Sequence, residues 1–443
     1  MKIVRFVFMQ KKDVGLLTII GLFIVPLVIW VFMKPLYLRF LSTETSFASL
    51  GEIAGLFGIM GISIVVILSA RLKFLEDYFG GYDRVYSIHH TLGVISFLAL
   101  LIHPISLALQ YAQVSVIDAA WLFIPSSDVA ITLGIISLLL MMIVLSVTMF
   151  AHRFSYRVLK TIHSSFGAAL LLGGVHGFLV PSDISRNSFM KFYVIGIVVI
   201  ALGAYAYRTL LGRWLVKRHV YGIEQVNTPV PGVTEVVLLP VDKRINHKPG
   251  QFVFVSFDDP NVFNEPHPFS ISSAPHEDVL RLTIKGLGDF TSTLGKLSVG
   301  SHALIEGPFG QFVYSNHENK HQIWIAGGVG VTPFLDMARD LCHRKPEGYS
   351  VDFFYTVRNA PEALFYQELS SMSDQYNGFR FIPYFSDGYG FLNAQAVATM
   401  SGGLFGKEIF VCGPPPMMNS LVGQFTAGGV SKKVIHFELF KML

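Results

Sequence analysis

The sequence predicts a membrane-embedded all-α bundle of six helices, followed by a β-barrel domain and a doubly wound α/β domain. Hydrophobic residues make up 52% of the 443 residues and charged residues only 14%, against about 25% charge in a soluble protein. Six apolar runs are long enough to cross a bilayer, and after residue 218 short strands and turns replace them. The predicted domains are therefore 1–218, 219–318 and 319–443.

The apolar runs of the first domain each approach the roughly 20 residues that a spanning helix needs. The first run lacks the small-residue cleavage site of a signal peptide, so we expect it to be a helix of the mature protein. The runs cover residues 14–33, 51–70, 86–109, 129–150, 161–180 and 190–211.

Basic residues predict the orientation of this bundle, because cytosolic loops carry an excess of Lys and Arg. With six spans both termini lie on one side, and the loops of that side hold most of the positive charge. The opposite loops hold only Lys34, Arg39, Arg186 and Lys191. We therefore expect a multi-pass protein of the cell (inner or plasma) membrane with cytosolic termini. The net charge of +4 gives no reason to expect a nucleic-acid partner.

The segment 219–318 is predicted to form a small β-barrel. Alternating apolar and polar residues, bounded by Pro and Gly turns, predict strands at Thr234–Leu239, Phe252–Phe257 and Leu280–Ile284. This pattern continues to about residue 318.

From His321 onwards strands alternate with helices. Strands are expected at Ile323–Ala326, Val351–Tyr355 and Ile409–Cys412, and helices at 333–344 and 361–372, which is the order of a doubly wound sheet. The only cysteines are Cys342 and Cys412. They are too few for a disulfide framework or an iron–sulfur cluster.

Histidines inside the predicted spans point to a function, since such residues are costly in lipid. His89 and His103 lie 14 residues apart on the third span, which places them on one helix face about 21 Å apart along the axis. His163 and His176 lie on the fifth span. The two pairs predict two b-type haems, one near each membrane surface, with both axial positions of each iron filled by histidine.

Two features of these histidines stay open. His163 and His176 are 13 residues apart, so we expect a bend near Gly173–Gly174 to bring them onto one face. His90 is a rival to His89. His89 is favoured by its spacing to His103 and by a glycine four residues further on, Gly93, because His163 is likewise followed by Gly167 and both glycines would leave room for a porphyrin. The alternative is that the histidines only hydrogen-bond between helices.

The barrel carries motifs of a known family. Pro249–Phe252 and the stretch His267-Pro268-Phe269-Ser270-Ile271-Ser272-Ser273 resemble the ferredoxin-reductase-like flavoproteins, and more narrowly the ferric reductase/NADPH oxidase family. The resemblance implies FAD binding, with Phe269 on the isoalloxazine, Ser270 near flavin N5 and His267 facing the pyrophosphate. It further implies a pyrophosphate loop that opens a helix at 290–297 and contains Lys285, Gly288 and Thr291.

The α/β domain continues the resemblance. A glycine-rich turn between a strand and a helix is a context for phosphate binding, and here it matches the family's NAD(P)-binding turn, with Gly327, Gly328, Gly330, Thr332 and Pro333. The segment Cys412-Gly413-Pro414 resembles the family motif that lies beside the nicotinamide.

The resemblance also assigns residues to the catalytic centre. It implies catalytic roles for Cys412 and Glu438 at the contact between flavin and nicotinamide, and a flavin-covering ring for Phe440, with Met442 as the rival position. Arg358 is a candidate partner for a 2′-phosphate, which favours NADPH over NADH. Leu159 departs from the family, whose members often carry tryptophan there.

Together these features imply a transmembrane oxidoreductase. Electrons from cytosolic NADPH or NADH would pass via FAD and two haems to an extracytoplasmic small-molecule acceptor, a ferric chelate or oxygen giving superoxide. Two alternatives remain: an electron-donor module for a dedicated extracytoplasmic partner protein or a quinone, and a haem-free transport or anchor bundle fused to a flavin reductase.

Overall fold

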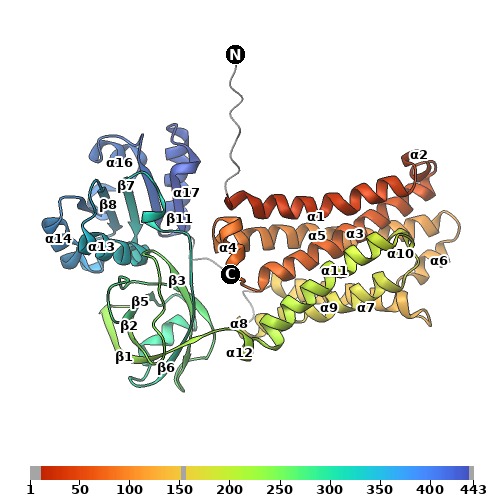
Figure 1. Ribbon diagram of the computed structural model, residues 1–443, viewed down its shortest axis with the longest axis horizontal. Helices are drawn as coiled ribbons and strands as arrows, with labels where there is room; N and C mark the ends of the chain where they lie inside the picture. Colours follow the sequence, from red (N-terminus) through yellow and green to blue (C-terminus); the bar gives the residue numbers. More distant parts are fainter. Residues whose placement is uncertain (1–10, 151–155, 439–443) are drawn as a thin grey trace, which may run out of the picture. The chain divides into compact units, whose positions relative to one another are not determined.

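The computed structural model describes residues 11–150 and 156–438. The chain divides into two compact units: one extends to Val216 without Gly81–Asp83, and the other combines Gly81–Asp83 with the residues after Val216. The first is helical, and the second contains two β-sheets (Figure 1). The predicted fold class is confirmed.

Among the residues that the structure describes, six spans before Val216 are long and apolar enough to cross a membrane. They are formed by α1 (Lys11–Met33), α3 (Thr43–Ser69), α5 (Tyr82–Ala112), α7 (Val129–Met149), the pair α8 (Tyr156–Ser164) and α9 (Phe166–Leu179), and α11 (Ser188–Tyr205), which continues as a π-helix over Ala206–Leu210. Short helices stand between or after them: α2 (Leu36–Arg39), α4 (Lys73–Phe79), α6 (Val116–Trp121), α10 (Asp183–Arg186) and α12 (Gly212–Leu215).

Side-chain caps start three of these spans. Ser42 and Thr45 form a reciprocal capping box at the start of α3, Asp128 accepts from the N–H of Ile131 at α7, and Asn187 accepts from the N–H of Met190 at α11. Such caps satisfy N–H groups that the helix leaves unpaired. The helix α3 therefore starts eight residues before the apolar run that predicted it.

The fifth span breaks at Ser165, and the predicted bend at Gly173–Gly174 is wrong. The hydroxyls of Ser164 and Ser165 donate to the carbonyls of Thr161 (2.6 Å) and Ile162 (2.7 Å). Such local bonds compete with the helical ladder and bend helices. Gly174 lies within continuous α9, where an added Cβ would meet Val198 at 2.8 Å, so it serves close helix packing.

Glycines also let α3 approach α5. A Cβ at Gly61 would lie 1.9 Å from Ser96 Oγ, and one at Gly58 would lie 2.5 Å from Leu100 Cγ. Small residues permit this close backbone approach in lipid, where van der Waals packing drives helix association. As a result α3 is the most buried of the spans.

The second unit begins with a six-stranded antiparallel sheet in the order β4-β3-β6-β1-β2-β5. A bridge between Ile271, just after β4, and Leu282 in β5 joins the two edges, so the sheet closes into a barrel. The strands are β1 (His219–Val230), β2 (Val233–Pro240), β3 (Phe252–Asp258), β4 (His267–Ser270), β5 (Leu280–Lys285) and β6 (His302–Phe309).

A five-stranded parallel sheet follows, in the order β11-β10-β7-β8-β9. Helices cover both of its faces (Figure 1): α13 (Thr332–Arg344) and α14 (Tyr366–Gln375) share one core, and α16 (Ala394–Met400) and α17 (Pro415–Ala427) share the other. The strands are β7 (His321–Gly327), β8 (Ser350–Val357), β9 (Phe379–Phe385), β10 (Glu408–Cys412) and β11 (Ile435–Glu438), and α15 (Ser386–Tyr389) follows β9.

Two predicted helices differ from the structure. The helix expected at 361–372 begins only at Tyr366, because Ala360–Glu362 forms a 3-10 turn and Phe365 has a φ of 56°. The helix expected at 290–297 is a 3-10 segment, Thr291–Lys296.

Candidate functional site

The structure brings His89 on α5 together with His163 on α8. Their ring centres lie 6.4 Å apart. His89 Nδ1 bonds to the carbonyl of Val65 on α3 at 2.9 Å, and the His163 ring packs edge-on against Phe166. His90 is exposed, so His89 is the histidine of the two that meets the fifth span.

A second pair joins His103 on α5 and His176 on α9, with ring centres 6.3 Å apart. The Nδ1 atoms bond to the carbonyls of Gly51 (2.8 Å) and Ala130 (2.7 Å). The bond to a carbonyl makes Nδ1 the protonated nitrogen and leaves Nε2 for a metal.

Both pairs fit ligation of a haem iron. Two metal–imidazole bonds of about 2 Å, with roughly 1.1 Å from each nitrogen to its ring centre, require ring centres about 6 Å apart. The separations of 6.4 and 6.3 Å meet this requirement. His89 and His103 lie on the continuous helix α5, which separates the two sites by about 21 Å at 1.5 Å per residue.

Two glycines that the sequence analysis did not single out lie directly against the histidine rings of the second pair. A Cβ added at Gly55 or at Gly134 would lie 2.7 Å from Nδ1 of His103 or His176, respectively. The sequence alone carries no signal for these two glycines, because their role depends on which helix packs beside them. The room expected beside Gly93 exists, since its nearest neighbour is Val65 at 3.9 Å.

The room expected beside Gly167 does not exist. A Cβ there would overlap the Tyr205 ring at 2.3 Å. The prediction for Gly167 is therefore wrong: this glycine lets the fifth span pack against the sixth.

In the second unit three residues of the implied catalytic centre meet. Ser270 Oγ, at the end of β4, donates to Glu438 Oε2 at 3.3 Å, and Cys412 Sγ lies 3.8 Å from the Glu438 carbonyl oxygen. All three are buried. Burial, with a contribution from Glu438, raises the pKa of Cys412 well above its ordinary value. The thiol is therefore neutral and is not a nucleophile.

The strand β4 also carries His267, Pro268 and Phe269, all of them half-buried. The His267 imidazole stacks on Phe290 with ring centres 3.9 Å apart, and its Nε2 lies 3.5 Å from a Glu265 oxygen. Phe269 lies parallel to the same Phe290 ring at 6.4 Å. Phe290, which the sequence reasoning did not single out, orders this aromatic face.

Thr291 organises the loop after β5. Its Oγ1 accepts hydrogen bonds from the N–H groups of Leu287 (2.9 Å) and Gly288 (3.1 Å). Lys285 is exposed at the end of β5. Gly288 has nothing within 4 Å of an added Cβ, so the loop presents open space at this position.

The glycine-rich turn lies at the carboxyl ends of β7 and β10, where the strand order reverses. A Cβ at Gly330 would lie 2.3 Å from the Cys412 carbonyl oxygen, and one at Gly327 or Gly413 would meet Met417 within 2.7 Å. Gly328 has a φ of 54°, and Thr332 and Pro333 open α13. Pro414 caps α17. A switch point of this kind is where doubly wound sheets bind nucleotides.

Of the three remaining predicted positions, the structure describes only Arg358. Arg358 follows β8, is exposed and forms an ion pair with Glu362, so a 2′-phosphate would compete with this carboxylate. Phe440 and Met442 lie outside the described residues.

A buried carboxylate connects the barrel to the α/β domain. Asp336 on α13 accepts from the N–H of Gly250 at 2.8 Å and lies 3.5 Å from His247 Nε2. Burial raises its pKa to about 6. Gly250, in the turn before β3, has a φ of 95° and leaves no space for a side chain.

Three family models match successive parts of the chain. The ferric reductase like transmembrane component matches residues 54–174, an FAD-binding domain matches 223–332, and an oxidoreductase NAD-binding domain matches 324–422.

Individual relatives cover parts of this arrangement. The reductase component of propane 2-monooxygenase from Mycolicibacterium goodii is 27% identical over 49% of this chain and 68% of its own length. Dual oxidase 2 from Rattus norvegicus is 34% identical over 24% of this chain, which spans only 8% of that protein. A flavohemoglobin from Malassezia yamatoensis with bound FAD and heme has a TM-score of 0.52 at 17% identity, covering 90% of this chain and 99% of its own, a likeness of fold alone.

The succession of a ferric-reductase-like membrane component, an FAD-binding domain and an NAD-binding domain, with dual oxidase among the relatives, matches the ferric reductase/NADPH oxidase family.

Proposed function

We propose that this NAD(P)H oxidoreductase moves electrons from cytosolic NAD(P)H through FAD and two b-type haems to an acceptor on the other side of the membrane. The observation that carries the proposal is the pair of imidazole contacts, His89 with His163 and His103 with His176, at ring separations of 6.4 and 6.3 Å. Three of the four histidines do hydrogen-bond between helices, through Nδ1 to backbone carbonyls on α3 or α7. Those bonds do not account for the approach of the imidazoles to each other, and they leave Nε2 for a metal.

A haem with two histidine ligands supplies one-electron transfer without an open coordination position. Reduction of the final acceptor is then outer-sphere, which suits a ferric chelate or oxygen. The carbonyls of Val65, Gly51 and Ala130 orient the imidazoles and raise their basicity as ligands.

FAD supplies the exchange between a two-electron hydride donor and one-electron acceptors. The contribution of this chain is positional. Ser270 and Glu438 share a hydrogen bond beside the buried thiol of Cys412, and the turns that carry Gly330 and Gly413 pack against each other at the switch point. We propose that the nicotinamide lies over this group, with the thiol as a neutral contact.

The proposal is tested with the purified protein in liposomes that contain a trapped, membrane-impermeant ferric chelate. NADPH or NADH added outside should reduce the trapped chelate, through those molecules whose second unit faces outward. The His103→Ala variant should lose this activity, while reduction of a soluble dye added outside stays within about twofold of wild type. Equal loss of both activities would contradict the proposal that the second unit oxidises NAD(P)H and the helical unit carries the electrons across the membrane.

A further inference from the structure

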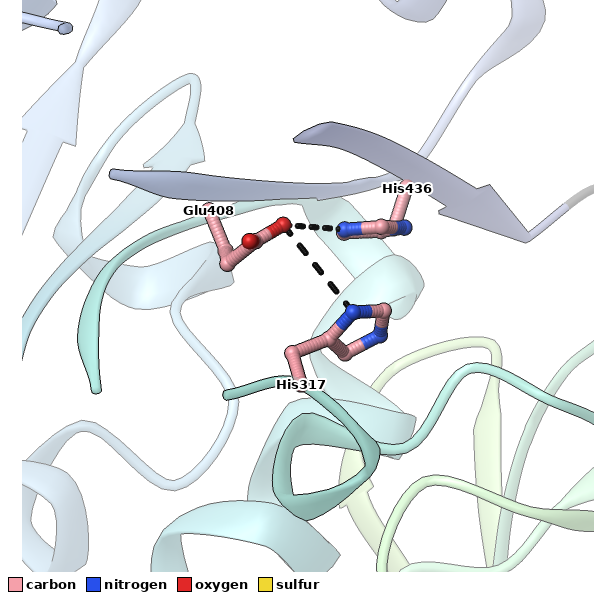
Figure 2. Close-up of side chains that lie close together, drawn as sticks. All are labelled: His317, Glu408 and His436. Atoms are coloured by element: carbon pink, nitrogen blue, oxygen red, sulfur yellow. Dashed lines mark hydrogen bonds and ion pairs between the residues drawn. The ribbon is translucent and has the colours of Figure 1, made fainter. Parts of the chain in front are cut away.

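A cluster of potential metal ligands lies in the α/β domain away from the residues assigned above (Figure 2). It consists of His317, Glu408 and His436, whose ligand atoms all lie within 4.8 Å of one another. His436 Nε2 is 2.7 Å from Glu408 Oε2, and His317 Nδ1 is 3.9 Å from the same oxygen. The three side chains converge from three segments that are distant in the sequence.

The sheet register explains two members of the cluster. Glu408 starts β10, and His436 on β11 pairs with Phe410, two residues further along β10. Residues two apart on a strand share a face, so Glu408, Phe410 and His436 lie on the same side of the sheet. His317 follows the 3-10 turn Tyr314–Asn316 just before β7.

Phe410 forms the floor beneath both imidazoles. It is fully buried, and its ring centre lies 5.3 Å from that of His317 and 4.7 Å from that of His436. The two imidazole rings are 3.9 Å apart. A packed floor of this kind fixes ring orientation, which a metal site requires of its ligands.

The geometry is close to that of a tetrahedral metal site. With metal–ligand bonds of about 2.1 Å, tetrahedral ligands lie about 3.4 Å apart. Two of the three ligand separations, 2.7 and 3.9 Å, bracket this value, and the third is at most 4.8 Å, so shifts of no more than about 1.5 Å suffice. The side chains are 23%, 13% and 19% exposed for His317, Glu408 and His436, which leaves access for an ion and for a water molecule as fourth ligand.

We propose that His317, Glu408 and His436 bind one Zn²⁺ ion. Two imidazole nitrogens and one carboxylate oxygen are a ligand set that zinc prefers and that Mg²⁺ and Ca²⁺, which take oxygen ligands, do not. The ion replaces the proton shared between His436 and Glu408. The site does not depend on the proposed function, because Glu408 lies at the amino end of β10, about 13 Å along the strand from Cys412.

The ion would tie the last described strand to its neighbours. Within the described residues β11 pairs only with β10, and it has four residues. Zn²⁺ would join β11 to β10 and to the segment before β7. Since Glu438 lies two residues after His436 on β11, the site would also steady the strand that carries Glu438.

The test uses the full-length protein, stripped with a chelator, exposed to equimolar Zn²⁺ and desalted. Elemental analysis should find about one zinc per chain in wild type and in His321→Ala, which removes an exposed histidine of the same domain. The His317→Ala and Glu408→Gln variants should compete at least tenfold more weakly against a fluorescent zinc chelator. A large excess of Mg²⁺ or Ca²⁺ should not displace the ion.

Glu408→Gln keeps side-chain size and an acceptor for His436, so retained FAD and an unchanged melting temperature of the stripped protein would show that it folds. X-ray absorption at the zinc edge of the wild type gives a second measurement, which should detect two imidazole ligands. Equal zinc retention in wild type and all variants, or a zinc spectrum without two imidazoles, would overturn the proposal.

Discussion

Ser270 donates a hydrogen bond to Glu438 at 3.3 Å across 168 residues of sequence. One residue ends a strand of the barrel and the other ends the last described strand of the parallel sheet. The contact therefore joins the barrel to the parallel sheet, at the point where Cys412 also lies.

Replacing Ser270 with Ala should slow flavin reduction by NAD(P)H. The hydroxyl would no longer orient the Glu438 carboxylate, and misplaced groups of this kind cost about tenfold or more in rate. Stopped-flow bleaching of the flavin band measures the step directly. The FAD content should stay near that of wild type, and an unchanged rate would contradict the role given to this hydrogen bond.

Replacing Gly134 with Ala should disturb the second histidine pair alone. The added methyl would lie 2.7 Å from His176 Nδ1, which forces the ring away from the carbonyl of Ala130. We expect the purified variant to hold about half the haem of wild type. Gly196→Ala is the matched control, because nothing lies within 4 Å of its Cβ. Equal haem content in both variants would argue against tight packing around the second histidine pair.

The buried Asp336 should make stability depend on pH. Its folded pKa is about 6 against an ordinary value of 3.8, so the folded state holds the proton more tightly. The contribution of this carboxyl group to the free energy of unfolding is fully present below pH 3.8 and is lost as the pH rises to about 6. Above that pH the free energy of unfolding of Asp336→Asn should exceed that of wild type by up to roughly 3 kcal/mol, and near pH 4 the two should be similar.

Melting temperatures of the purified protein at pH 4 and pH 8 measure this difference. The exposed Asp374→Asn variant should follow wild type at both pH values. If Asp336→Asn differs from wild type by the same amount at both, the buried carboxylate is not the group responsible.

Arg358 should distinguish NADPH from NADH if its guanidinium binds the 2′-phosphate. The ion pair with Glu362 keeps the guanidinium at the end of β8 until a phosphate replaces the carboxylate. Arg358→Ala should raise KM for NADPH about tenfold, the loss of a charge-assisted bidentate contact, and leave KM for NADH unchanged. A similar rise in KM for both nucleotides would show that Arg358 does not recognise the 2′-phosphate.

The sequence predicted the spans and six of the eleven described strands, because local patterns set those elements. The apolar runs and the alternation around Phe252–Phe257 survive in the structure as predicted. The strand β9 was missed because Pro383 interrupts its pattern, and proline is confined largely to edge strands. Indeed β9 is an edge of the parallel sheet.

One feature that was not predicted is local. The fifth span breaks at Ser165, where serine hydroxyls bond to carbonyls three residues back, whereas the sequence pointed to glycines. The other features depend on contacts between distant segments. The roles of Gly55 and Gly134 appear only when another helix brings its histidine alongside. The cluster of His317, Glu408 and His436 needs the strand register before its members can be recognised as neighbours.

The haem content of histidine variants tests the central claim most directly. The pyridine haemochrome spectrum of the purified protein should give two b-type haems per chain in wild type and in His90→Ala, because His90 is exposed and His89 is the residue that meets His163. His103→Ala and His176→Ala should each retain one haem. No b-type haem in wild type, or two haems per chain after loss of His103 or His176, would contradict the account.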